Sequence, residues 1–145
     1  MIDAALGQLV AQLNEALKRG ANVSHDIVRA SNLFEPNGDV VPDIENKVLV
    51  FLVNLERETL PYKAAAGKMG RSLRFSEGQP PLHLNLSVMV AANFSGRHYA
   101  DALRYLSLSV GFFQRRPVFD HANTPALDAR IDRLVLEIEH LGVNE

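Results

Sequence analysis

The feature that most limits the fold is a strict alternation of apolar and polar residues between positions 82 and 90. Leucine or valine occupies each even position, while His83, Asn85 and Ser87 take odd ones. Because successive side chains of a strand point to opposite faces, the pattern predicts a strand with one packed face and one polar face. The chain must therefore build a sheet and a core for that strand to lie against.

Two other segments have the period of an α-helix. Residues 2–18 form an amphipathic pattern with Asp3 near its start and Lys18 and Arg19 near its end, where these charges suit the helix dipole. Gly20 is expected to supply the positive φ that ends this helix. The second helix is expected at 97–115. We expect it to be covered over more than half of its surface, because its apolar stripe is broad: Tyr99, Ala102, Leu103, Leu106, Val110 and Phe113, widened by Tyr105, Leu108 and Phe112.

The remaining segments give shorter signals. Residues 26–33 suggest an edge strand, and the turn at 35–39 is expected to have a strand on each side. Residues 47–55 are apolar at both parities, which predicts a strand covered on both faces. Residues 117–119 are too few for more than an extended connector. Residues 127–141 fit a helix, yet part of the same segment alternates as a strand does, and periodicity alone leaves both open.

Composition narrows the function classes. The chain has 145 residues, with 15 basic and 17 acidic side chains and a net charge of −2, so we expect one domain that binds neither nucleic acid nor an anionic membrane. The absence of cysteine excludes disulfides, thiolate metal sites and cysteine nucleophiles. The N-terminal residues do not resemble a secretory signal, which predicts synthesis in the cytoplasm.

The sequence carries no nucleotide-binding, hydrolase or zinc-protease motif. No two of the five histidines have the i,i+3 or i,i+4 spacing that puts two imidazoles on one helix face. On a strand, His83, Asn85 and Ser87 stand about 6.6 Å apart, too far for a nucleophile and its base. The acidic pairs Asp43 with Glu45 and Glu137 with Glu139 fit a solvated surface better than acid–base catalysis. We therefore expect no catalytic residue, metal or cofactor.

A long segment at 57–80 contains several glycines and prolines without a sustained period, which predicts a functional loop. It is locally basic, whereas residues 128–145 are net acidic. Opposite charge at two places on one chain suits a head-to-tail contact between copies, although chance explains it equally well. The protein-interface residues that we predict on this loop and on the polar strand face are Lys63, Lys68, Arg71, Arg74, His83, Asn85 and Ser87.

Several strings across the chain carry a more specific signal. The chain resembles the N-terminal domain of the tail-terminator or cap proteins of extracellular contractile injection systems, including those of the antifeeding prophage and of Photorhabdus virulence cassettes. The resemblance covers nearly the whole chain and is most specific from residue 41 to 119. The strings that carry it are VPDIENK at 41–47, LVNLERE at 52–58, PPLHLNL at 80–86, AANF at 91–94, ALRYL at 102–106 and FFQ at 112–114.

The resemblance implies an α+β fold, with a mixed β-sheet flanked by two main helices, and a strand at 134–139. It implies a non-enzymatic cap, a homohexameric ring that closes the inner tube and the sheath at the end distal to the baseplate. Its partners would be further copies, the inner-tube protein and the sheath protein. It would be assembled in the cytoplasm and then released as part of an extracellular particle. Related sequences continue beyond the position of Glu145 with a helix and a strand, so we expect residues 1–145 to form one tail-terminator-like domain without that extension.

Two other functions remain open. The chain is alternatively an adaptor or a baseplate-associated component of a phage-tail-like particle, bound one copy at a time. A small hydrolase or isomerase that uses His83 ranks last.

Overall fold

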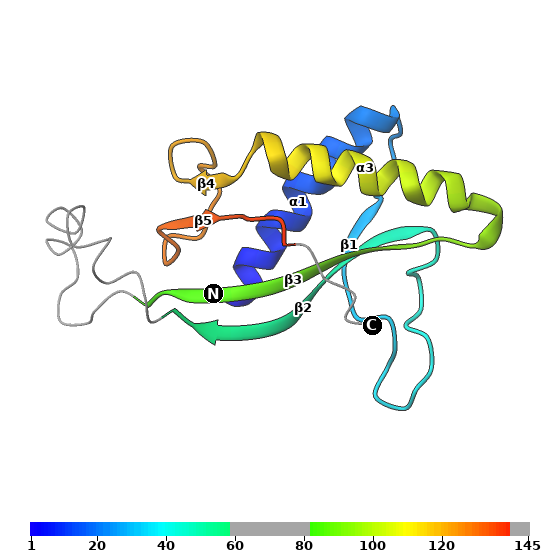
Figure 1. Cartoon of the computed structure of the whole chain (residues 1–145), viewed down its shortest axis with the longest axis horizontal. Coiled ribbons are helices and arrows are strands. Elements are labelled where there is room, and N and C mark those ends of the chain that lie inside the picture. The colour runs from blue at the N-terminus through cyan, green and yellow to red at the C-terminus, as the bar shows by residue number, and fades with distance from the viewer. Residues whose placement is uncertain (59–81, 140–145) are drawn as a thin grey trace, which may run out of the picture. The chain divides into compact units, whose positions relative to one another are not determined.

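The computed structural model of the chain describes residues 1–58 and 82–139. The chain divides into two compact units, one of residues 1–51 and 89–145 and the other of residues 52–88. The first unit holds both α-helices, and strands β2 (Lys47–Arg57) and β3 (Leu84–Asn93) each continue from one unit into the other (Figure 1). The prediction of one domain over residues 1–145 stays a prediction.

The first unit begins with helix α1 (Ile2–Ala21), followed by strand β1 (Val28–Ala30). After β3 come a 3-10 turn, η1 (Gly96–His98), and helix α3 (Tyr99–Arg115). Strands β4 (Val118–Asp120) and β5 (Arg133–Val135) form a separate antiparallel sheet. The main sheet has the order β1-β2-β3, with β1 parallel to β2. This mixed sheet and the two helices confirm the predicted α+β class.

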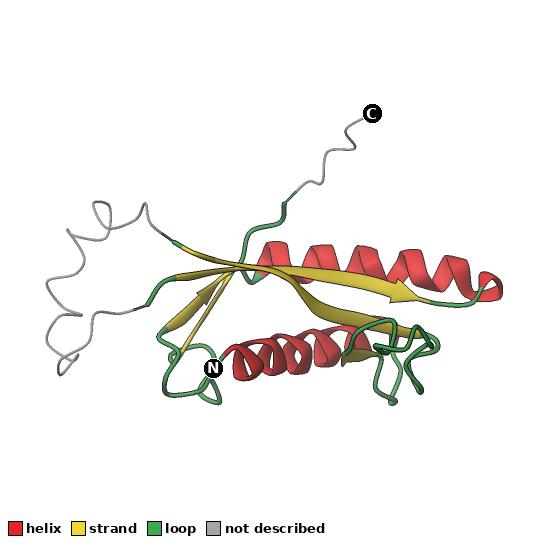
Figure 2. Cartoon of the chain, turned by 90° about the horizontal axis from the view of Figure 1, so that it is seen from below, coloured by secondary structure: helices red, strands yellow, loops and turns green. Residues whose placement is uncertain are grey.

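Helix α1 buries one residue in every four, because that spacing keeps the side chains on one face. This face packs against β1 and α3, and the two helices lie side by side (Figures 1 and 2). The helix runs to Ala21, three residues past the predicted end. Its buried residues are Ala5, Leu9, Leu13 and Leu17.

Gly20 does not end helix α1, contrary to the prediction. Asn22 adopts the left-handed conformation instead, with φ 54°, and its N–H and that of Val23 bond to the last helical carbonyls. A Cβ on Gly20 would lie 3.2 Å from Leu108 of α3. The glycine at position 20 is therefore explained by the close approach of the two helices, and not by its freedom in φ.

Strand β2 is covered on both faces over only part of its length. Val48, Leu49 and Val50 are buried, and β1 pairs with these three residues alone. Leu52 and Val53 are 37% and 58% exposed. They belong to the second unit, whose described residues form no helix to cover them. The prediction of burial on both faces is thus confirmed for the first half of the strand and wrong for the second.

Helix α3 is less covered than predicted. Ala102, Ser109 and Phe112 are its buried residues, whereas Tyr99 and Leu103 are 65% and 48% exposed. The apolar stripe is wider than the surface that α1 and the core offer to it. The expectation that more than half of this helix is covered is therefore wrong.

The C-terminal segment resolves as a strand rather than a helix at 133–135. Phe119 of β4 lies opposite Leu134 of β5, so residues 117–119 are not a mere connector. The predicted pair of strands around the turn at 35–39 is reduced to one isolated bridge between Phe34 and Val40. Over residues 1–58 and 82–139, neither helix has the length and apolar character that crossing a bilayer requires.

Candidate functional site

The polar face predicted on strand β3 lies in the second unit. His83, Asn85 and Ser87 are exposed, whereas Leu84 and Leu86 between them are half-buried. The structure thus agrees with the alternation read from the sequence. The role of these three side chains in an interface stays a prediction.

A short network holds this polar face in place. The Glu58 N–H donates to the carbonyl oxygen of His83 at 3.0 Å, and the Asn85 amide donates to the Glu58 carboxylate. Within residues 1–58 and 82–139, the His83 ring has no hydrogen-bond partner. An unsupported imidazole on an exposed strand lacks the oriented base that a hydrolase needs.

The basic residues predicted on the long loop, Lys63, Lys68, Arg71 and Arg74, lie outside the described residues. Their role in an interface therefore stays a prediction.

The second unit also exposes apolar side chains that the sequence pattern assigned to packed faces. Leu55 and Leu82 are 45% and 55% exposed, and Leu52 and Val53 lie on the same unit. Exposed apolar groups beside polar ones are typical of protein–protein contact surfaces. No sequence signal distinguishes these residues from the buried part of β2, because both halves of the strand have the same composition.

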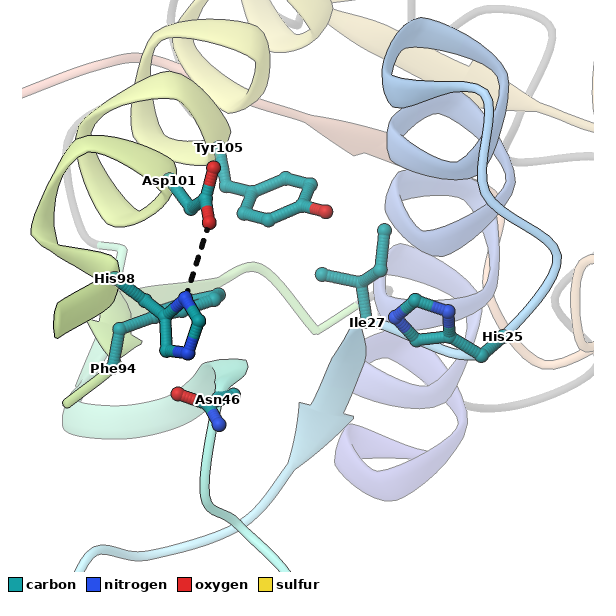
Figure 3. A pocket seen from close by; sticks show the side chains of 7 residues that line it. All are labelled: His25, Ile27, Asn46, Phe94, His98, Asp101 and Tyr105. Carbon is teal, nitrogen blue, oxygen red and sulfur yellow. Dashed lines mark ion pairs between the residues drawn. The ribbon is translucent and has the colours of Figure 1, made fainter.

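The first unit contains a small open pocket of about 210 Å³, shown in Figure 3. Its walls come from the segment before β1, the turn before β2, and the start of α3. Figure 3 shows His25 and His98 on opposite sides of it. The residues that line the pocket are His25, Ile27, Asn46, Phe94, His98, Asp101 and Tyr105.

The polar contacts of this pocket are weak. His98 Nδ1 lies 3.4 Å from Asp101 Oδ2, and both side chains are about half exposed, at 51% and 56%. An ion pair with this exposure contributes at most about 1 kcal/mol. The rings of Phe94 and Tyr105 stack with their centroids 5.5 Å apart and close one wall. The histidines at this pocket are far apart in the sequence, so spacing could not predict that they would meet.

The pocket does not form a recognisable catalytic or metal centre. Across the part of the chain that the structure describes, no three histidine, aspartate or glutamate side chains are grouped so as to hold a metal ion. The remaining histidine of the first unit with a defined contact, His121, bonds through Nε2 to the carbonyl oxygen of Ile131 at 2.7 Å. That bond fixes the loop between β4 and β5, which is a structural role.

Comparison with known proteins bears on the function more directly than the pocket does. A search of curated proteins finds no match to the chain. The family model described as the Pvc16 N-terminal domain matches residues 5–145, which is nearly all of the sequence. The resemblance inferred from the sequence strings is therefore confirmed. The chain belongs to the Pvc16 N-terminal domain family, which makes it a structural component related to the contractile injection particles of the Photorhabdus virulence cassettes.

Proposed function

We propose that this protein is a non-enzymatic cap, a homohexameric ring that ends the tube and sheath of a contractile injection particle at the end distal to the baseplate. The observation that carries the proposal is the family match over residues 5–145. The protein would assemble in the cytoplasm on the inner-tube and sheath proteins and then leave the cell as part of an extracellular particle.

The exposed surfaces of the chain support such a role. A cap acts by occupying the end of a stacked cylinder, so it needs surfaces for neighbouring subunits and no reaction centre. The second unit offers exposed Leu52, Val53 and Leu55 together with the polar face of β3. Such a mixture suits a contact that forms once during assembly and then persists.

We propose that the polar face, His83, Asn85 and Ser87, and the basic loop residues contact the tube or the sheath. Changing Lys68, Arg71 and Arg74 together to glutamate tests the loop. If the loop docks on an acidic neighbour, the triple variant is absent from purified particles while the wild type is present. Equal amounts of the two proteins in particles would remove the loop from the interface.

Localisation on the particle separates a cap from an adaptor or a baseplate-associated component. The protein can be tagged, labelled with gold particles and observed on purified particles by electron microscopy. The cap proposal predicts label at the end opposite the baseplate. Label at the baseplate, or along the sheath, would contradict the proposal and favour the alternative.

A further inference from the structure

Helix α3 presents an apolar stripe that the core leaves uncovered. Tyr99, Leu103 and Val110 are 65%, 48% and 46% exposed. Their spacing of four and seven residues places them along one side of the helix. The buried residues of α3 lie on a different side, so a neighbouring molecule can cover this stripe without disturbing the core.

Two cations flank this stripe. Arg104 and Arg115 are exposed, and neither forms an ion pair within residues 1–58 and 82–139. A guanidinium nitrogen of Arg115 lies 3.1 Å from the place that a Cβ on Gly111 would occupy. Gly111 thus lets the charged group of Arg115 lie against the helix surface, close to the apolar stripe.

A second surface of the first unit has the complementary character. In the segment 133–139, Val135 and Ile138 are 67% and 42% exposed. Glu137 and Glu139 are also exposed and have no cationic partner among the described residues. Strand β5 pairs with β4 along one edge (Figure 1). The segment therefore offers apolar and acidic side chains where α3 offers apolar and basic ones.

We propose that the α3 stripe of one copy packs against the 133–139 segment of a second copy. Val135 and Ile138 would cover Leu103 and Val110, while Glu137 and Glu139 would face the two arginines of α3. Because two different surfaces of the same chain meet, the contact is head-to-tail and repeats from copy to copy, as a closed ring requires. The inference rests on the proposed ring and names the surfaces that build it.

The occupant is a second copy because the two surfaces match each other in both charge and apolar content. Unpaired charges of opposite sign on a single chain satisfy one another in every contact of a ring. A tube or sheath protein seated on either surface would leave the other surface unmatched, and that arrangement is an outcome that the experiment below detects.

The test uses two charge-reversed variants of the full chain. One carries Glu137→Arg and Glu139→Arg, and the other carries Arg104→Glu and Arg115→Glu. Each places like charges in every head-to-tail contact, so each is expected to weaken self-association about tenfold or more. Sedimentation equilibrium measures the association, and circular dichroism checks that these surface changes leave the fold intact.

Mixing the two variants is the decisive step. In an alternating assembly, every contact again joins arginine to glutamate, so the equimolar mixture is expected to recover the wild-type oligomer. A single chain that carries all four changes is expected to recover it as well. A mixture that stays dissociated, or a single reversed variant that assembles like the wild type, would overturn the proposal. Wild-type protein that stays monomeric at all concentrations and binds purified tube protein through these residues would also overturn it.

A matched pair of apolar variants tests the stripe itself. Val110→Asp places a charge in the proposed contact and is expected to reduce self-association. Val40→Asp makes the same change at a residue that is 62% exposed and lies outside both surfaces, and it is expected to have no effect. Equal effects of the two changes would contradict the assignment.

The outcomes also separate this contact from the capping function. If the variants lose the ring but particle length stays controlled, the contact is wrong and capping stands. If the ring obeys the charge pattern but tube length does not depend on the protein, the contact stands and capping is wrong.

Discussion

Asn14 ties helix α1 to the segment that enters β1. Its Oδ1 accepts the backbone N–H groups of Ile27 and Val28 at 2.9 and 3.1 Å, and its Nδ2 donates to Asp26 Oδ1 at 2.8 Å. This hydrogen bond, followed by the charge of Lys18, holds the pKa of Asp26 below its usual range. The sequence cannot reveal this role, because the partners lie 12 to 14 residues further along the chain.

Asn14→Ala is expected to destabilise the protein by about 1–3 kcal/mol, because two partly buried N–H donors lose their acceptor. Urea denaturation measures the change. Glu15→Ala, at the neighbouring exposed position, is the control and is expected to stay within about 0.5 kcal/mol of the wild type. Equal stabilities of the two variants would refute the role given to Asn14.

Asp128 closes the loop between β4 and β5. Its Oδ1 accepts the Arg130 backbone N–H at 2.8 Å and the Arg130 Nε–H at 2.9 Å. Oδ2 accepts from a terminal guanidinium nitrogen of Arg130 at 2.6 Å. These hydrogen bonds, from the side chain first and then the backbone, hold the pKa of Asp128 well below its ordinary value of 3.8.

A lowered pKa in the folded state fixes the sign of the pH effect. The carboxylate stabilises the fold above the unfolded-state value of 3.8, and this contribution is lost as the pH falls from there toward the folded-state pKa. Wild type is therefore expected to exceed Asp128→Asn in stability at about pH 6, with the difference shrinking below about pH 4. Thermal unfolding across that range measures it. A difference independent of pH would show that the Asp128 charge is not involved.

At the scale of elements, β4 contributes the largest fully buried side chain. Phe119 is 0% exposed. Its ring centroid lies 6.2 Å from that of Phe112 on α3, and the Arg116 guanidinium lies 5.1 Å from the same ring centroid. A strand of three residues thus anchors the small sheet to helix α3.

Phe119→Ala is expected to cost about 3–5 kcal/mol, since it removes a buried ring and leaves a cavity. Chemical denaturation, followed by far-UV circular dichroism, measures this loss. Phe34→Ala provides the control, because Phe34 is 60% exposed and should change stability by about 0.5 kcal/mol or less. A small effect at Phe119 would mean that the β4–β5 sheet does not depend on this core.

The elements predicted from the sequence are those whose pattern is repeated. Helix α1 shows its period over four turns of buried residues, and β3 shows its alternation over most of its length. Strand β4 has three residues, and its partner β5 begins twelve residues after β4 ends, so neither could be assigned from local pattern. Coverage was overestimated for β2 and α3, because a sequence shows which residues are apolar but not how far the neighbouring elements reach.

At the scale of the whole molecule, the candidate surfaces were predictable only in part. The exposure of His83, Asn85 and Ser87 followed from alternation. The exposed stripe of α3 did not, because its residues look like core residues until the fold shows which side of the helix is covered. The family was predictable because long ordered strings identify it, whereas the pairing of the α3 stripe with 133–139 depends on tertiary exposure alone.

The most direct measurement of the central claim is the length distribution of particles produced with and without this protein. Electron microscopy of particles purified from cells that lack the gene, and from cells in which it is restored, gives both distributions. A protein that ends a growing cylinder predicts broad, uncontrolled lengths in its absence and one sharp length when it is restored. Particles without it that keep the same uniform length, with stable ends, would contradict the account.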